Sequence, residues 1–298
     1  MTLPKHVQWI ANPKGGVGDN VKLAQRACDV LKSHGVGSGV TVTEHAGHAR
    51  SLVQEIAWEE GHAIGGIGGD GTMHELVNGL MSRRAEERMP LTLLPGGTGN
   101  SFLRDLDRID PEGALEGLAA LSSRSIDLFE VRIGPVVRYG FNIIGWGLFS
   151  HANELAEALR WMGRRRYDIA ALIRLVQNNQ FDGRLEFDGQ VVGGGFSVLA
   201  AANTMYTGLG MKLAPQARLD DGKLDLVFLR NTSRRMLLNL FRGLGTGRHV
   251  ERPEVEYHQV REFSLVTQEG VSITLDGELI EGGSFAVRVL PGALSLLL

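Results

Sequence analysis

The sequence predicts two domains, an N-terminal α/β domain built on a parallel sheet and a C-terminal β-sandwich domain. The first observation is that short apolar runs alternate with helical stretches before residue 125, as is typical of β-α units. The second is a change after residue 125 to strand-like runs separated by short turns, as is typical of a β-sandwich. The third is the length of 298 residues, which is enough for two cores.

The composition is that of an ordinary globular protein. Hydrophobic residues make up 43% of the chain and charged residues 22%. The formal net charge of −3 disfavours broad electrostatic binding to nucleic acid, so we expect no nucleic-acid partner. The N-terminal residues lack the apolar segment of a signal peptide, and no apolar run approaches the ~18 residues that a membrane span needs. We therefore expect a cytoplasmic protein.

The N-terminal domain contains four predicted strands. They are expected at residues 7–11, 40–43, 63–67 and 91–94. Apolar residues at helical spacing predict a helix after each of the first three strands, and the third helix is expected to begin at Gly71 or Thr72. The one cysteine, Cys28, lies in the first helix and is expected to be a small buried side chain.

A glycine-rich turn at residues 65–72 reads Gly-Gly-Ile-Gly-Gly-Asp-Gly-Thr. Backbone N–H groups of such a turn and of a helix N-terminus attract phosphate groups. Asp70 is an acid in this turn, which opposes anion binding unless the acid holds a metal ion or takes a proton. Asp70 therefore indicates a site of phosphoryl chemistry. Thr72 is expected to donate a hydrogen bond to a phosphate or to cap the helix. The alternative is a tight turn that uses Gly and Asp for their backbone freedom.

Two further loops repeat this pattern. Thr98 and Asn100 lie in a glycine-rich loop after the fourth strand, and Asn12 and Lys14 lie in the loop after the first. Because the carboxyl ends of parallel strands share one edge of a sheet, we favour a ligand site there over three unrelated turns. A Walker-type loop is absent. The Gly-x-Gly-x-x-Gly match at residues 66–71 follows the third strand, whereas a dinucleotide fingerprint belongs at the first.

The second half of the chain is rich in predicted strands. They are expected at residues 125–133, 136–144, 183–187, 191–202, 224–229, 255–260, 262–266, 271–275 and 284–290. Helices are expected at residues 151–176 and 236–244, and the domain boundary near residues 124–127. The arginine run at residues 164–166 is interpreted as a solvated helix face, with contact to anionic lipid as the alternative.

Two turns in this half carry carboxylates. These are Asp220, Asp221 and Asp225 in the first turn, and Asp276 and Glu278 in the second. Taken alone, an Asp-Gly turn between strands is ordinary hairpin chemistry. His74 and His151 lack the spaced partners of a zinc site. No Ser-His-Asp pattern with a Gly-x-Ser-x-Gly elbow is present.

Several ordered motifs together resemble the diacylglycerol kinase catalytic domain family, which includes sphingosine kinases and bacterial lipid kinases. The motifs are Asn-Pro at residues 12–13, Gly-Gly-Asp-Gly-Thr at 68–72, Pro-Gly-Gly-Thr-Gly-Asn at 95–100, Ile-Asp at 126–127, the segment 203–210, Ala-Pro at 214–215, Leu-Asp-Asp-Gly-Lys-Leu-Asp at 219–225 and Asp-Gly-Glu at 276–278. The resemblance covers nearly the whole chain. Residues 73–80 and the Trp-Gly pair at 146–147 are more similar to the sphingosine kinase branch.

The resemblance implies a nucleotide-binding α/β domain with an NAD-kinase-like fold, a β-sandwich lipid domain and a cleft between the two. We place the ATP-binding domain at residues 1–125 and the lipid-substrate domain at residues 126–290. The final strand, at residues 290–298, is a candidate to return to the first domain. An apolar cavity for acyl chains is expected in the second domain.

The resemblance also implies roles for individual residues. The implied catalytic residues are Asp70, Asp127 and Glu278, with either Asp70 or Glu278 as the general base. The residues implied to contact ATP are Asn12, Thr43, Gly68, Gly69, Gly71, Thr72, Met73, His74, Gly97, Thr98 and Asn100. The implied ligands of a structural Mg²⁺ are the Asp221 carboxylate and the backbone carbonyls of Arg218 and Lys223.

Two positions depart from the family pattern. Ser101 stands where the family often has Asp, so one metal or phosphate contact is missing. His151 stands where matching sphingosine kinases carry an acid that holds the substrate ammonium. Because a histidine near neutral pH is neutral or positive, it is a poor partner for a cation. We therefore expect His151 to contact an uncharged lipid alcohol.

The predicted function is an ATP- and Mg²⁺-dependent lipid kinase that phosphorylates a diacylglycerol-like hydroxyl during transient contact with a membrane surface. A sphingoid-base kinase, an NAD kinase and a non-catalytic nucleotide- or lipid-binding protein remain as alternatives. A homodimer is compatible with the sequence, which does not determine the oligomeric state.

Overall fold

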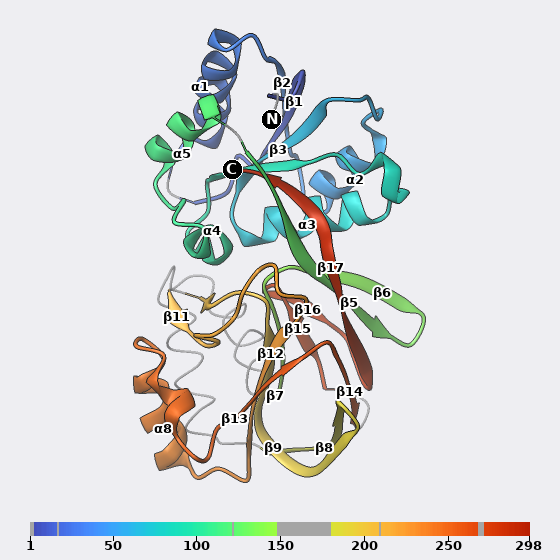
Figure 1. The fold of residues 1–298 in the computed structure, drawn as a ribbon, viewed down its shortest axis with the longest axis vertical. Helices are drawn as coiled ribbons and strands as arrows, with labels where there is room; N and C mark the ends of the chain where they lie inside the picture. The colour runs from blue at the N-terminus through green and yellow to red at the C-terminus, as the bar shows by residue number, and fades with distance from the viewer. Residues whose placement is uncertain (1–2, 17, 121, 148–179, 209, 268–270) are drawn as a thin grey trace. The chain divides into compact units, whose positions relative to one another are not determined.

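A computed structural model describes residues 3–16, 18–120, 122–147, 180–208, 210–267 and 271–298. The chain divides into two compact units, one of Met1–Ile126 and Gly292–Leu298 and the other of Asp127–Pro291. The division falls within two long strands, β5 (Ser123–Ile133) and β17 (Phe285–Leu297), which both pass from one unit to the other (Figure 1). The predicted fold class is confirmed, because one unit holds a parallel sheet and the other an antiparallel β-sandwich.

Unit 1 is built on a parallel sheet. Its strands are β1 (His6–Ala11), β2 (Gly37–Val42), β3 (His62–Gly68) and β4 (Leu91–Pro95), in the order β2-β1-β3-β4. The last part of β17 adds a further parallel strand beside β4, with Leu296 opposite Leu91. All four strands that the sequence predicts in this domain are present, with ends that differ by at most a few residues.

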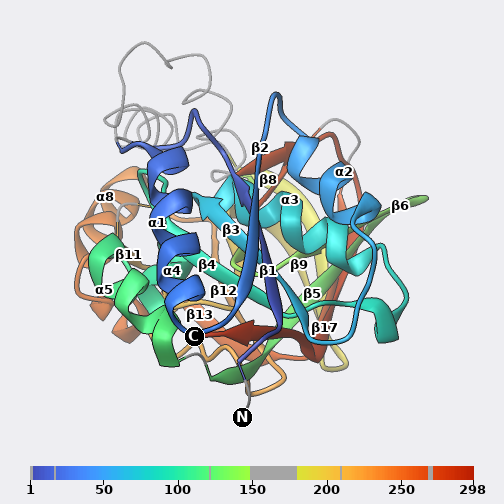
Figure 2. The same cartoon turned by 90° about the horizontal axis from the view of Figure 1, so that it is seen from above.

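Helices cover both faces of this sheet. They are α1 (Asn20–Ser33), α2 (His48–Glu55), α3 (Asp70–Met81), α4 (Ser101–Asp105) and α5 (Pro111–Gly117), with short 3-10 helices η1 (Ala85–Glu87) and η2 (Leu118–Ala120). Figure 2 shows α1 and α5 on one face and α2 and α3 on the other. Alternate residues of β1, Val7 and Trp9 among them, pack with Leu23 of α1 in one buried cluster, as the two-residue period of a strand requires. Cys28 packs against this cluster as a small apolar side chain, although it is only partly buried.

The apolar spacing predicts that helix α3 begins at Gly71 or Thr72, but the helix begins at Asp70. The backbone N–H of Met73 donates to the carbonyl oxygen of Gly69 at 3.1 Å, which closes the first turn earlier. An acidic side chain in the first turn is also favourable because of the helix dipole. Asp70 is therefore part of the helix N-terminus.

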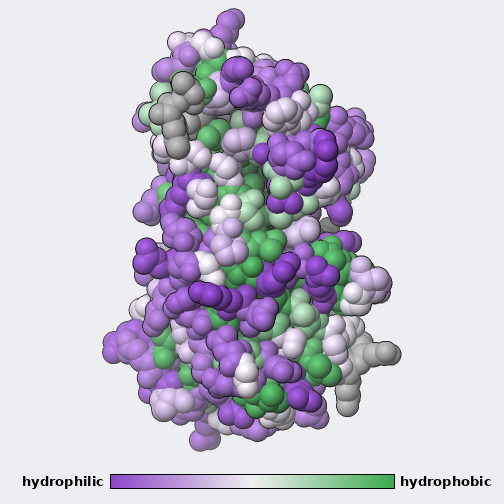
Figure 3. Space-filling model, turned by 45° about the vertical axis from the view of Figure 1, so that its right-hand side comes forward, coloured by the Kyte–Doolittle hydropathy of each residue, from purple (hydrophilic) through white to green (hydrophobic). Residues whose placement is uncertain are grey.

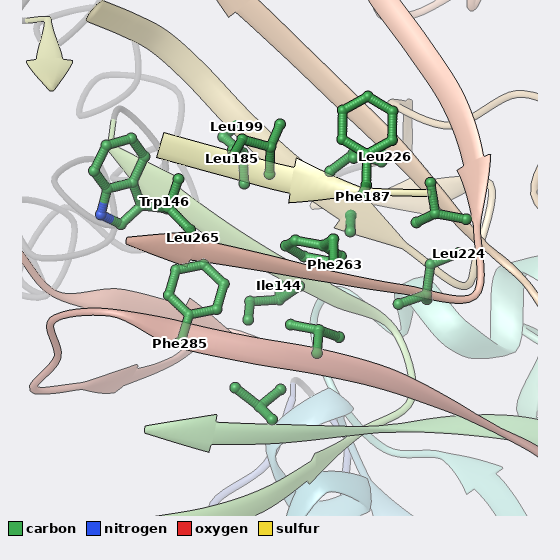
Figure 4. Packing of buried hydrophobic residues seen from close by; sticks show 14 of the residues in the cluster. Ile144, Trp146, Leu185, Phe187, Leu199, Leu224, Leu226, Phe263, Leu265 and Phe285 are labelled. Atoms are coloured by element: carbon green, nitrogen blue, oxygen red, sulfur yellow. The ribbon is translucent and has the colours of Figure 1, made fainter. Parts of the chain in front are cut away.

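Unit 2 is an antiparallel β-sandwich. Its strands are β5, β6 (Val136–Gly140), β7 (Ile143–Gly147), β8 (Phe181–Phe187), β9 (Gln190–Ala202), β12 (Leu224–Arg230), β13 (Glu256–Val260), β14 (Glu262–Thr267), β15 (Ile273–Leu275), β16 (Glu278–Ile280) and the first part of β17. One series runs β16-β15-β7-β9-β8-β14-β17, while β12 pairs with β9 and β13, and β5 pairs with β6. Figure 4 shows buried side chains from different strands in one cluster, with the Phe263 and Phe285 rings edge-on at 6.1 Å.

The strand predicted at residues 136–144 is two strands, β6 and β7, which are interrupted at Phe141 and Asn142. The Asp276 carboxylate accepts hydrogen bonds from the backbone N–H groups of Phe141, Asn142 and Ile143 at 3.2, 2.9 and 3.0 Å. These bonds take the place of strand pairing at the bend. The sequence could not reveal the interruption because Asp276 is distant along the chain.

The remaining elements of unit 2 are short. They are β10 (Tyr206–Thr207), β11 (Met211–Lys212), α8 (Arg234–Gly243) and η4 (Arg248–Glu251). Helix α8 starts two residues before the predicted helix because the Ser233 side chain caps it by accepting from the Met236 backbone N–H. The predicted helix at residues 151–176, including the arginine run, lies outside the described residues.

Hydrophilic residues cover much of the face drawn in Figure 3, with smaller hydrophobic areas between them. Among the helices of the described residues, none has both the length and the apolar character needed to cross a membrane.

Candidate active site

The glycine-rich loops after β1, β3 and β4 meet at the carboxyl edge of the unit 1 sheet. The backbone N–H of Gly96 donates to the Gly68 carbonyl at 2.9 Å. A Cβ atom on Gly97 would lie 2.3 Å from the Gly69 Cα, and one on Gly16 would lie 2.2 Å from the Gly96 carbonyl oxygen. The predicted arrangement of the three loops on one edge is therefore confirmed, and close backbone contact explains the need for glycine.

Asn20 holds two of these loops together, and the sequence analysis missed it. Its side-chain amide donates to the carbonyl oxygens of Asn12, Gly15 and Gly96 at 2.7, 3.2 and 3.1 Å. The residue is only 2% exposed, and its bond to the Gly96 carbonyl is buried while the other two are partly buried. The one signal in the sequence was the place of this polar residue at the start of an amphipathic helix.

Asp70 binds the N-terminus of α4. Its carboxylate accepts from the backbone N–H groups of Ser101 and Phe102 at 3.0 and 3.3 Å. Asn100, which precedes α4, has a left-handed backbone with φ of 50° and offers no side-chain cap to this helix. Asp70 therefore has a structural task as a helix cap, whatever chemistry it performs.

Asn12 and Thr72 connect the first and second loops. The Asn12 amide donates to the Thr72 hydroxyl at 3.3 Å, and the Asn12 side-chain oxygen accepts from the Lys14 backbone N–H at 3.0 Å. Gly68 has no room for a side chain, because its Cβ would lie 2.2 Å from the Thr72 hydroxyl oxygen. Asn12 and Thr72, two of the side chains predicted to contact ATP, are thus hydrogen-bonded to each other.

The other predicted nucleotide contacts differ in accessibility. Thr98 and Gly71 are exposed, whereas Thr43, Met73 and His74 are buried. The Thr43 backbone N–H donates to the Ala11 carbonyl at the end of β1, at 2.9 Å.

Asn100 closes its own loop. Its side chain accepts from the Gly97 N–H at 3.1 Å and donates to the Gly97 carbonyl at 3.0 Å. The His74 ring lies 3.3 Å from the Asn78 amide nitrogen. A small cavity beside these loops, lined by Asp70, Thr72 and Phe102 among others, has room for about one water molecule.

In unit 2, Asp127 fastens the turn that carries the predicted metal ligands. Its backbone N–H donates to the Leu219 carbonyl at 2.7 Å, and its carboxylate accepts from the Gly222 N–H at 2.6 Å. Asp221 accepts from the Lys223 N–H at 3.0 Å. The structure therefore brings Asp127 to the same turn as Arg218, Asp221 and Lys223.

Asp225 is a second carboxylate beside this turn, and its environment could not be predicted from sequence. It is 1% exposed, and burial raises its pKa to about 6. One oxygen accepts from the Tyr257 hydroxyl at 2.5 Å and from the Gln259 amide at 3.4 Å. The other oxygen is buried without a hydrogen-bond partner among the described residues. The Tyr257 oxygen also accepts from the Gln216 N–H at 3.2 Å, which links Asp225 to the preceding turn.

The donor set of this turn fits a hard cation. Carboxylate and carbonyl oxygens are the ligands that Mg²⁺ prefers, usually with several waters retained. The second oxygen of Asp225 is buried without a hydrogen-bond partner among the described residues, and a cation nearby would favour the ionised form of this carboxyl. Within the described ranges there is no cluster of three His, Cys, Asp or Glu residues that could hold a metal, so carbonyls and water would have to complete the shell.

Asp276 and Glu278 lie at the hairpin between β15 and β16. Asp276 is 5% exposed and binds the bend at residues 141–143, whereas Glu278 is exposed at the first position of β16. Asp276 and Gly277 have φ of 52° and 96°, so the turn has the positive φ values of a two-residue hairpin loop. The hairpin interpretation is correct, and the buried carboxylate adds a role as an anchor. The predicted substrate residue His151 lies outside the described residues.

Comparisons with known proteins agree with both units. Residues 6–131 match the model of the diacylglycerol kinase catalytic domain, and residues 142–298 match that of the YegS C-terminal NAD kinase beta sandwich-like domain. A diacylglycerol kinase of Mycobacterium tuberculosis (strain ATCC 25618 / H37Rv) is 30% identical over 296 residues, covering 98% of this chain and 94% of that protein.

Further relatives include a probable YegS-like lipid kinase of Pseudomonas aeruginosa, 34% identical over 258 residues that cover 86% of this chain and 82% of that protein. Sphingosine kinase 2 of Arabidopsis thaliana is 26% identical over 339 residues, covering 94% of this chain and 70% of that protein. A crystal structure of a putative diacylglycerol kinase from Bacillus anthracis str. Sterne has a TM-score of 0.81 at 25% identity, covering 100% of this chain and 98% of that one. This chain belongs to the lipid kinase family that is defined by the diacylglycerol kinase catalytic domain.

Proposed function

We propose that this protein transfers the γ-phosphate of ATP to the hydroxyl of a diacylglycerol-like lipid, with Mg²⁺ as cofactor and during transient contact with a membrane surface. One observation carries the proposal: three glycine-rich loops are held in backbone contact beside Asp70 and Thr72. Such loops offer backbone N–H groups to phosphates, and a lipid kinase needs this site for its nucleotide.

The loops of unit 1 are assigned to ATP. Backbone N–H groups of residues 68–72 and 97–98, with the Thr72 hydroxyl, would bind phosphate oxygens. Asn12 supports this arrangement because its amide already holds the Thr72 hydroxyl at 3.3 Å. Asp70 would orient the reacting groups, and its bonds to the α4 backbone fix the carboxylate for that task. Positioning of this kind supplies most of the catalysis in phosphoryl transfer.

The turn at residues 218–223 is assigned to Mg²⁺, held by the Asp221 carboxylate and the carbonyls of Arg218 and Lys223. When bound, Mg²⁺ neutralises negative charge and orders the oxygens around it. Asp127 is proposed as a positioning residue for this turn, because it binds the backbone on both sides of Asp220 and Asp221.

Glu278 is assigned as the general base. Its carboxylate is exposed and makes no hydrogen bond or ion pair with a described residue, so it is open to a substrate hydroxyl. As the lipid oxygen bonds to the γ-phosphorus, Glu278 takes the hydroxyl proton. The bond from the γ-phosphorus to the bridging oxygen breaks, and ADP leaves.

Two lipid classes are candidate acceptors. Sphingosine kinases are among the relatives at 26% identity, so a long-chain base is a second candidate acceptor. A histidine at position 151 favours an uncharged lipid. Diacylglycerol is therefore the acceptor that we propose.

The proposal is tested by incubating the purified chain with labelled ATP, Mg²⁺ and separate mixed micelles of diacylglycerol, sphingosine or a natural lipid extract. We expect labelled phosphatidic acid in the first reaction, identified by mass, and none with Glu278→Ala. Phosphorylated sphingosine at equal or greater yield would show that the acceptor is a long-chain base. Phosphorylation of NAD, supplied in a fourth reaction, would make the protein an NAD kinase. ATP hydrolysis that no acceptor stimulates would contradict a kinase role.

A further inference from the structure

Helix α8 carries a concentration of positive charge that the proposed chemistry does not use. Residues 230–252 contain six arginines and one acidic residue, in a chain whose formal net charge is −3. On α8 itself Arg234, Arg235 and Arg242 are exposed. None of the three forms an ion pair with a described carboxylate, and Arg242 donates to the Asn239 side-chain oxygen at 3.5 Å.

Two of these arginines are placed against the helix dipole. The first turn of α8 contains Arg234 and Arg235 and no acidic residue. Cations at a helix N-terminus are unfavourable, because the backbone N–H groups there already carry partial positive charge. The Ser233 cap stabilises this end of α8 but adds no negative charge. Helix stability therefore does not explain these arginines.

An apolar side chain lies between the arginines. Arg234, Leu238 and Arg242 are spaced four residues apart and form one row along the helix surface. Leu237 and Leu240 are buried in the cluster behind the helix, and Leu238 packs against its edge and stays half-buried. A helix face made only for solvent would be expected to place acidic or polar residues in this row. A polar face rich in arginine is a feature of helices that bind the surface of anionic membranes.

We propose that α8 docks on an anionic lipid bilayer, with Arg234, Arg235 and Arg242 against lipid phosphates and Leu238 at the edge of the acyl region. The inference rests on the proposed function, because an enzyme that phosphorylates a lipid must meet the bilayer that contains it. The complementary charges of the arginines and an anionic leaflet select this partner. Each such residue near an anionic surface strengthens binding about fivefold, so the three together are expected to contribute on the order of 100-fold.

The test is co-sedimentation of the full chain with lipid vesicles, in the absence of ATP and acceptor. The vesicles contain phosphatidylcholine alone or phosphatidylcholine with phosphatidylglycerol. We expect the wild type to bind the mixed vesicles and to be released by salt, as exposed charges are screened. The variant R234Q/R235Q/R242Q should lose on the order of 100-fold in affinity for mixed vesicles.

A matched control removes three positive charges elsewhere. Lys22, Arg26 and Arg84 are exposed residues of unit 1, and each is paired with a carboxylate. K22Q/R26Q/R84Q changes the net charge equally and should keep wild-type vesicle binding. The α8 variant should melt no lower than the wild type, because it removes cations from the helix N-terminus. Loss of binding by unfolding is thereby excluded.

Three results would overturn the inference: equal binding to vesicles without phosphatidylglycerol, wild-type binding by the α8 variant, or the same loss in the control. Capture of an acidic polypeptide by α8, with vesicle binding unchanged by the α8 substitutions, would assign the helix to a protein partner instead. The proposed function is judged separately, by turnover of acceptor dispersed in neutral detergent, which the α8 variant should retain. A wild type that binds vesicles but phosphorylates no lipid would contradict the kinase proposal alone.

Discussion

Gly69 and Gly97 are in direct backbone contact, because a Cβ atom on Gly97 would lie 2.3 Å from the Gly69 Cα and 2.8 Å from the Gly69 nitrogen. Real Cβ atoms essentially never come closer than 3.0 Å to another heavy atom, and here the neighbour is main chain. The loops after β3 and β4 can therefore meet in this way only while position 97 is glycine, whereas a Cβ on Gly69 would lie 3.1 Å from the Gly97 Cα, a tight contact. Their contact brings Asp70 to the N-terminus of α4.

Gly97→Ala should separate the two loops. We expect turnover to fall by at least tenfold and the melting temperature to decrease, since overpacking typically costs about 1–3 kcal/mol. The matched control is Gly99→Ala in the same loop, where the new Cβ would lie 3.5 Å from the nearest Asp70 oxygen, an ordinary contact. Steady-state kinetics and thermal denaturation of both variants provide the measurement. Equal effects of the two substitutions would show that the close contact is unimportant.

Asp70→Asn separates the structural task of this residue from its proposed chemistry. The two backbone N–H groups now donate to different oxygens of the carboxylate, and the amide keeps only one acceptor oxygen for them. We expect a stability loss of about 1–2 kcal/mol but a fall in turnover of about 10²–10⁴-fold, the range for a residue acting on the transferred group. Ser101→Ala retains the backbone donor and should have little effect. Turnover of Asp70→Asn within about tenfold of wild type would leave Asp70 as a helix cap alone.

Prediction from sequence succeeded where the signal is local. The parallel strands and the glycine loops that follow them could be predicted because hydrophobic periodicity and turn chemistry are properties of neighbouring residues. Asn20 could not be identified, since its acceptors belong to residues 12, 15 and 96 and are brought together only by folding. Asp225 was likewise recognised as one acid among several, because its burial depends on Tyr257 and Gln259 in another strand.

Asp276 and Glu278 are two residues apart. We expect loss of the charge to lower stability at Asp276 and turnover at Glu278. Asp276→Asn leaves one acceptor oxygen for three backbone N–H groups. The free energy of unfolding should therefore fall by about 2–4 kcal/mol, with activity lost only as the protein unfolds. Glu278→Gln removes an exposed charge, so stability should change by less than about 0.5 kcal/mol while turnover falls by about 10²–10⁴-fold. Denaturant unfolding and kinetics on the same samples distinguish the two. A fully active Glu278→Gln would rule out Glu278 as the base.

Asp225→Asn should stabilise the protein at neutral pH. Burial raises the pKa of Asp225 to about 6 from an ordinary value of 3.8, so between these pH values the folded chain holds a proton that the unfolded chain does not. The stability contributed by this group is highest at low pH and is lost as the pH rises through 6. Asparagine cannot ionise and avoids the loss. The gain in unfolding free energy should grow from below about 1 kcal/mol near pH 4 to on the order of 1–3 kcal/mol near pH 7.5.

The measurement is denaturant unfolding of wild type and variant at several pH values, in EDTA so that no cation at the Asp221 turn offsets the Asp225 charge. Burial lowers the pKa of His249. The contribution of His249 cancels when the unfolding free energy of the wild type is subtracted from that of the variant at each pH. Tyr257→Phe is the companion variant. It removes the hydroxyl that donates to Asp225 at 2.5 Å, so the pKa should rise further and the loss of stability should continue to a higher pH. A gain for Asp225→Asn that is the same at pH 4 and pH 7.5 would show that the carboxyl does not titrate in this range, and that its second oxygen has found a partner.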